Sequence, residues 1–257
     1  MNNYMAFLKK EFLENARTYK MLILFMVFLI FGIMNPLVAK LTPELLSALV
    51  PEMSEGMSIV LPEPSAFDSW AQFFKNISQI GIIVVIIIFS GILSTELSKG
   101  TLINVLTKGL SRTAVIFSKF TCMASLWTIS VAISFAVTQL YTIYLFPTDK
   151  VSNLLFSVFC MWLFGIFLLA LLMFTATFTR NNYGCLLLTG AGAVICMLVN
   201  ISPAAHKYNP LSLASDNMAL LTNDIETSSL YTCIWIACAL TLVLVSLSVL
   251  IFRKRQL

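Results

Sequence analysis

Six long stretches of this chain contain no charged residue, and they constrain the fold more than any other feature. A helix needs about 20 apolar residues to cross a hydrocarbon core roughly 30 Å thick, so each stretch can cross a membrane once. Only 11% of the residues are charged, whereas soluble domains contain about 25%. The stretches also lack the strict alternation of a transmembrane β-barrel. We therefore predict an all-α integral membrane protein with six transmembrane helices, in the windows 21–39, 76–95, 120–146, 151–179, 181–205 and 227–252.

The basic residues predict which side of the membrane holds the chain ends. An even number of spans places both termini on the same side. Of the 16 Lys and Arg residues, those assigned to the opposite side are Lys40, Lys75, Lys150 and Lys207. Because cytoplasmic loops carry an excess of Lys and Arg, both termini are expected in the cytoplasm. The net charge of +4 thus reflects topology and does not indicate nucleic-acid binding.

The first 20 residues predict a short helix that precedes the first span. Apolar side chains recur at helical spacing, while basic and acidic residues occupy the other faces. The apolar positions are Met5, Leu8, Phe12, Ala16 and Tyr19. We interpret residues 1–20 as an amphipathic helix in the headgroup layer. The alternative is an ordinary basic flank of the first span.

The segment 96–119, between the second and third spans, predicts a second surface helix. It begins at Glu96, and Leu102, Val105 and Leu106 form an apolar stripe at helical spacing. Gly109 can adopt the left-handed conformation that ends a helix, and the next span follows. We therefore expect an amphipathic helix that lies across the cytoplasmic face and connects two spans.

Two segments on the predicted outer side carry further expectations. The loop 40–75 holds aromatic residues expected to anchor short interfacial helices at the headgroups. These are Phe67, Trp70, Phe73 and Phe74. The segment before the sixth span, from Asn200 to Ser229, mixes short apolar stretches with turn residues. It is interpreted either as a re-entrant helix pair or as a surface loop.

Several kinds of chemistry are excluded by what the sequence lacks. The phosphate-binding pattern Gly-x-x-x-x-Gly-Lys-Ser/Thr does not occur, so this chain is not expected to hydrolyse ATP. His206 has no Cys or acidic neighbours at metal-ligand spacing, and no Cys-x-x-Cys pair occurs. We expect no metal site, no bound cofactor and no catalytic residues. Ionisable residues are also absent from the middle of the windows, which argues against ion-coupled transport and membrane-embedded catalysis.

The stretches KKEFLENARTYKMLIL and ELSKGTLINVLTKGLSRTAVIFSK resemble the type-2 permeases of bacterial ATP-binding-cassette exporters. The resemblance extends over essentially the whole chain, so residues 1–257 are expected to form one permease domain. Its most specific part consists of Glu96, Gly100, Thr101, Leu102, Leu106, Ser111, Arg112 and Lys119. Many relatives have a proline before the Ser-Arg pair, where this chain has Gly109 and Leu110.

The resemblance implies how such a protein is driven. The segment 96–119 would be a coupling helix that docks on a separate ATPase subunit, and residues 1–20 would be a connector helix beside it. Leu102, Val105 and Leu106 would face the ATPase or the membrane. The coupling residues implied are Glu96, Lys99, Gly100, Thr101, Leu102, Val105, Leu106, Lys108 and Arg112.

The resemblance also implies the assembly and the path. A homodimer of six-span permeases would work with two ATPase copies, which bind ATP and magnesium, and spans two and five would border the path. The polar candidates along it are Gln79, Ser90, Thr189 and Asn200. The competing interpretation is that these four residues make helix contacts.

The leading functional hypothesis is the permease subunit of an exporter in the bacterial cytoplasmic membrane. Because the presumed path is nearly uncharged, the expected substrate is hydrophobic or amphipathic, such as an antimicrobial peptide, a drug or a lipid-like molecule. A polysaccharide exporter is a weaker option. The alternative from another class is a non-transporting membrane anchor or sensor that docks a cytoplasmic signalling partner. A membrane-embedded enzyme is disfavoured.

Overall fold

The computed structural model describes residues 3–49, 63–98, 100, 102, 106–107, 109–147, 151–179 and 181–254. Within these ranges the chain is helical and contains no strand. Six helical segments are long and apolar enough to cross a membrane: Lys20–Glu44, Ala66–Glu96, Arg112–Leu145, Leu154–Phe178, Asn182–Asn200 and Thr227–Lys254. The predicted all-α class and six spans are confirmed.

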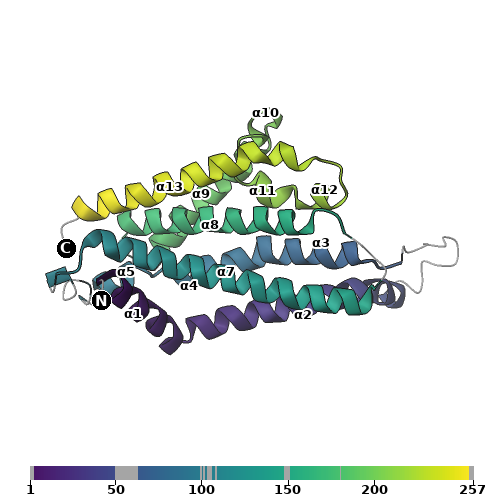
Figure 1. Ribbon diagram of the computed structural model, residues 1–257, viewed down its shortest axis with the longest axis horizontal. Coiled ribbons are helices and arrows are strands. Elements are labelled where there is room, and N and C mark those ends of the chain that lie inside the picture. Colours follow the sequence, from purple (N-terminus) through teal and green to yellow (C-terminus); the bar gives the residue numbers. More distant parts are fainter. Residues whose placement is uncertain are drawn as a thin grey trace.

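The helices form an elongated bundle in which neighbouring spans run in opposite directions (Figure 1). Helix α1 (Asn3–Arg17) and the last turns of α13 (Tyr231–Lys254) lie at the same end, which we call the terminal end. The opposite end is the distal end. The connections between consecutive spans therefore lie alternately at the distal end and at the terminal end.

Helix α1 meets α2 (Lys20–Leu49) at an angle, and Tyr19, which has a φ of 59°, ends the first helix. The buried face of α1 is not the apolar stripe that periodicity predicts. Phe7, Glu11 and Asn15 point into the protein, whereas Met5 and Tyr19 are exposed. The face of α1 that contains Glu11 and Asn15 therefore packs inward, because both side chains find polar partners on α7.

The second span is built from four consecutive pieces. They are α3 (Ala66–Asn76), the π-helix η1 (Ile77–Gly81), α4 (Ile82–Phe89) and α5 (Ser94–Ser98). The span begins at a capping box in which Ser65 and Asp68 bond to each other, ten residues before the charge-free window 76–95. Its aromatic residues Trp70, Phe73 and Phe74 are buried in the core. The expectation that they anchor a separate interfacial helix is wrong, because they belong to this span and pack against α2 and α7.

The third and fourth spans form the centre of the bundle. Helix α7 (Arg112–Leu145) packs along α2, and α8 (Leu154–Phe178) packs along α13. Helix α7 begins eight residues before the window 120–146, so Arg112 and Lys119 belong to the span and not to the surface segment before it. A buried and a half-buried tryptophan join α7 to α8: Trp127 Nε1 donates to the carbonyl of Trp162, and Trp162 Nε1 donates to Thr128 Oγ1.

Helix α9 (Asn182–Asn200) forms the fifth span and packs mainly on α8. The segment before the sixth span folds back as α10 (Pro203–His206), α11 (Ser212–Ser215) and α12 (Asn217–Leu221), followed by the 3-10 turn η2 (Thr227–Leu230). Leu213 and Leu220 are buried where α11 and α12 pack on α8. The segment is therefore an ordered helical cap on the distal half of the bundle.

The close approach of α7 to α8 predicts a strong effect at Gly165. A Cβ atom there would lie 2.3 Å from two carbons of the Trp127 indole. The ring is buried and cannot rotate away without losing its hydrogen bond. We expect Gly165→Ala to lower the unfolding free energy by about 1–3 kcal/mol through overpacking, measured as a lower melting temperature of the purified protein.

The matched control is Gly190→Ala, because a Cβ atom at Gly190 has no neighbour within 4 Å. This variant should melt at the wild-type temperature or slightly above it, because alanine favours a helix more than glycine does. Equal melting temperatures for Gly165→Ala and the wild type would contradict the packing described for α7 and α8.

Candidate functional site

A buried network of charges joins three helices at the terminal end. The Lys119 ammonium of α7 lies 2.9 and 3.0 Å from the two carboxylate oxygens of Glu11 in α1, and 2.7 Å from Glu96 Oε2 in α5. The side chains of Lys119, Glu11 and Glu96 are only 2, 4 and 9% exposed. Because an isolated buried charge is costly, these groups stabilise the fold only together. The network therefore holds α1 against the bases of spans two and three.

Lys10 supplies a second cation on the exposed side of this network. Its ammonium pairs with Glu96, with Glu11 Oε1 at 3.1 Å and with Glu14 Oε2 at 2.5 Å. Burial alone would lower the pKa of Lys10, but hydrogen bonds to Glu14 and Glu96 outweigh it and raise the pKa above its usual value. Lys10 thus stays protonated throughout the physiological pH range.

Three carboxylates of this network come close enough to hold a metal ion. Oxygens of Glu11, Glu14 and Glu96 lie within 4.8 Å of one another. However, the Lys10 ammonium contacts all three carboxylates, so a protein cation already occupies the position between them. We interpret the group as an ion-pair network and not as a metal site.

Sequence reasoning found Glu96 and Lys119 but missed Glu11 and Lys10. The helical periodicity of residues 1–20 placed the charged side chains on an exposed face. The available signal was the position of Glu11 between the apolar residues Leu8 and Phe12, which would place a carboxylate close to a buried face. No pattern in the sequence identifies Lys119 as its partner, because 108 residues separate the two.

The predicted coupling segment is described only in part. Glu96 lies in α5, which continues the second span, instead of beginning a separate helix. Gly100 and Gly109 have φ values of 65° and 91°, the left-handed conformation expected at Gly109. Leu106 is half-buried. Lys99, Thr101, Val105 and Lys108 lie outside the described residues.

Two residues of this segment have contacts that differ from the expected ones. Leu102 is 1% exposed and packs into the chain's own core, so the expectation that it faces a partner or the membrane is wrong. Arg112 Nη1 donates to the carbonyls of Phe252 and Arg253, both at 3.0 Å. Since these carbonyls belong to the last turn of α13, Arg112 ties the sixth span to the start of the third.

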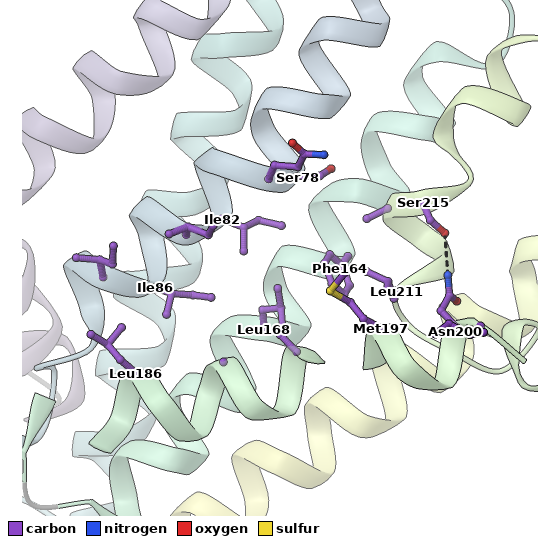
Figure 2. A pocket seen from close by; sticks show the side chains of 17 residues that line it. Ser78, Ile82, Ile86, Phe164, Leu168, Leu186, Met197, Asn200, Leu211 and Ser215 are labelled. Atoms are coloured by element: carbon purple, nitrogen blue, oxygen red, sulfur yellow. Dashed lines mark hydrogen bonds between the residues drawn. The ribbon is translucent and has the colours of Figure 1, made fainter. Parts of the chain in front are cut away.

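A cavity of about 770 Å³ lies between span two, α8, α9 and α11. Figure 2 shows its side chains. Apolar residues form most of its wall, among them Ile82, Ile86, Phe164, Leu168 and Met197. Its polar lining residues are Ser78, Gln79, Asn200 and Ser215. No charged side chain lines this cavity among the described residues.

The structure brings together two of the four polar residues proposed for the path. Gln79 and Asn200 both line the cavity. Ser90 is buried and donates to the carbonyl of Ile87 at 2.9 Å, and Thr189 is buried and donates to the carbonyl of Cys185 at 2.8 Å. Ser90 thus bonds within its own span, Thr189 also contacts Thr175 Oγ1 of α8 at 2.7 Å, and neither lines the cavity.

The cavity ends where spans two and five meet at the terminal side. Ser94 Oγ donates to Asn182 Oδ1, which joins α5 to the first turn of α9. Gly91 permits this approach, because a Cβ atom there would lie 2.8 Å from Asn182 Nδ2. At the distal side, Asn200 Nδ2 donates to Ser215 Oγ at 3.4 Å and its Oδ1 accepts from Asn209 Nδ2 at 3.0 Å. The cavity therefore lies between two polar contacts.

Comparison with known proteins places this architecture in a described family. A sequence model described as "ABC-2 family transporter protein" matches residues 5–257. The chain is also 24% identical over 215 residues to the uncharacterized transmembrane protein YxlG of Bacillus subtilis (strain 168), with 83% of each chain covered.

The buried charge network predicts a large effect of removing its central cation. Lys119→Met would leave the carboxylates of Glu11 and Glu96 without their buried partner, at a cost of about 3–5 kcal/mol. We expect a lower melting temperature and faster tryptic cleavage within α1. Lys40→Met is the control, because Lys40 is exposed and lies outside α1. The triple variant Lys119→Met, Glu11→Gln, Glu96→Gln should recover part of the loss. A single variant as stable as the wild type would contradict a structural role for the network.

Proposed function

The chain belongs to the ABC-2 family of transporter proteins, and on this premise we propose that it is the permease subunit of an ATP-driven exporter. It is a multi-pass membrane protein, and permeases of this family are membrane components that work with an ATPase partner. The observation that carries the proposal is the uncharged cavity beside span two, the span whose terminal end is joined by ion pairs to α1 and α7.

The ATPase would act on the terminal end of the bundle. In this proposal it docks on the segment 96–119 and on α1, which serves as the interfacial connector helix. Glu96, Lys119 and Glu11 tie the base of span two to that surface, so a displacement there would move α4 and the cavity wall with it. ATP and magnesium would bind to the ATPase, in two copies, and not to this chain.

A second copy of the permease would complete the path. Helix α9 is the least buried of the candidate spans, and Leu187 and Ile195 on its surface are 75 and 60% exposed. This apolar surface adjoins the cavity on the α9 side. A homodimer that contacts through spans two and five would cover the cavity and separate it from lipid.

The lining of the cavity supports a hydrophobic or amphipathic substrate. A cavity of this size lies within the range of small-molecule sites, in which apolar walls provide affinity and a few polar groups fix orientation. A substrate with an ionised group would meet no countercharge there. Peptides, drugs and lipid-like molecules were the three classes expected from the sequence.

The proposal predicts that Glu96→Gln uncouples the ATPase from transport. The experiment uses the permease purified with an ATP-binding-cassette ATPase from a neighbouring reading frame and reconstituted in vesicles. Because the amide cannot hold both Lys10 and Lys119, we expect efflux to fall by roughly 5- to 150-fold, the usual range of a coupling free energy, while ATP hydrolysis continues.

The control for this experiment is Glu63→Gln, an exposed carboxylate at the distal end. Its efflux should match the wild type. Unchanged efflux in Glu96→Gln would exclude the network as the transmission element. If no ATPase co-purifies and no efflux occurs, the anchor or sensor alternative would replace the exporter.

The orientation of the bundle gives a separate prediction. We expect the terminal end to face the cytoplasm, because most basic residues lie there. In intact cells a membrane-impermeant maleimide should label Glu63→Cys and not Lys9→Cys, and both should react after the membrane is permeabilised. Wild-type protein provides the background from its native cysteines. The opposite pattern would reverse the topology.

A further inference from the structure

We propose that the cavity binds a neutral amphiphile with a single apolar chain, whose polar group lies at the distal end beside Ser78 and Gln79. This inference rests on the proposed function, since it names the substrate class of the same cavity. It follows from where the polar groups lie, from their unmet hydrogen bonds, and from the absence of charge.

The cavity has a polar end and an apolar end. Span two passes from Ser78 at the distal side to Ile87, and α9 runs the opposite way, from Leu186 to Asn200. Figure 2 shows Ser78, Asn200 and Ser215 on one side of the cavity and Ile86 and Leu186 on the other. A ligand whose polar and apolar parts are to contact polar and apolar lining residues, respectively, therefore has a polar group at one end only.

The polar end has hydrogen-bonding capacity that the described residues do not use. Gln79 lines the cavity, is exposed, and makes no side-chain hydrogen bond with the described residues. Ser78 and Gln79 belong to the π-helix η1, an irregular turn inside an otherwise α-helical span. Single π-turns are frequent at functional sites. A hydroxyl or ester oxygen of a ligand would accept a hydrogen bond from the Gln79 amide.

The apolar end favours a hydrocarbon chain over a peptide. From Ser78 to Ile87 the helix rises by roughly 13 Å, the length of wall available to the chain. A peptide of that length carries several backbone amides, and each would need a partner that the isoleucine, leucine and phenylalanine side chains cannot supply. An acyl or alkyl chain has no such requirement.

The head group must also be uncharged. The described lining contains no Lys, Arg, Asp, Glu or His, so an ionised head would lose hydration without gaining a countercharge. Hydroxyl, ester and amide heads satisfy this condition. Ionised fatty acids and quaternary ammonium amphiphiles do not.

Binding can be tested with photoreactive monoacylglycerols and the purified permease in nanodiscs, without an ATPase. A diazirine at the end of the chain should label peptides that contain Ile86 and Leu186. A diazirine on the glycerol should label those that contain Gln79 and Asn200. Unlabelled monoacylglycerol should compete at least tenfold better than a fatty acid or an alkyltrimethylammonium of the same chain length. Labelling that does not depend on diazirine position, or equal competition by the charged analogues, would overturn the proposal.

Variants test the two ends of the cavity separately. Gln79→Leu should reduce labelling by the glycerol probe about tenfold, whereas Ser90→Ala, outside the cavity, should not. Met197 is 61% exposed and lines the cavity, so Met197→Lys introduces a cation of similar length. This variant should prefer the fatty acid, and Met197→Leu should keep the neutral preference. Retained neutral preference in a folded Met197→Lys would contradict the argument from charge.

The outcomes separate this inference from the proposed function. Specific labelling of the cavity without ATP-driven efflux would contradict the exporter proposal and leave the ligand assignment intact. ATP-driven efflux of another compound, with no labelling of the cavity, would overturn the ligand assignment alone.

Discussion

The buried ammonium of Lys119 is the interaction on which the terminal end depends. It lies in an otherwise apolar bundle, and Glu11 and Glu96 supply its countercharges from two other helices. A charge in this position is tolerated only when it is paired and hydrogen-bonded, so the three helices must keep their relative positions or lose all these contacts together. These ion pairs join α1, span two and span three at the surface where an ATPase is proposed to act.

The middle of the bundle, in contrast, contains a cavity with no charged side chain in its described lining. The ion pairs of Lys10 and Lys119 lie at the terminal end, while the cavity beside span two offers only hydroxyl and amide groups, and only near its distal end. The π-helix Ile77–Gly81 lies where these polar side chains enter the cavity. A single span thus carries an ion pair at one end and a neutral polar site near the other, which is the arrangement expected when force is applied at one end and a ligand is held further along.

Several residues are buried or paired in ways that their positions in the sequence do not predict. Leu102 was expected on an outward apolar stripe and Glu11 had no predicted role, yet both are buried. Ser90 and Thr189 are polar residues expected along the path, but both hydroxyls bond to backbone carbonyls of the preceding turn, and that of Thr189 also contacts Thr175 of α8. Gln79 and Asn200 do line the cavity. Helical spacing shows which residues share a face, but it does not show what covers that face.

The sequence by itself determined the membrane class, the number of spans and the family resemblance, because hydropathy and motif spacing are local properties that need no knowledge of packing. Only the tertiary structure decided that Glu11 meets Lys119 across 108 residues and that Arg112 caps the sixth span. It also decided which polar residues reach the cavity. These contacts depend on how each helix is rotated and which helix lies beside it, and the hydrophobic pattern of a nearly uniform apolar span leaves that rotation open.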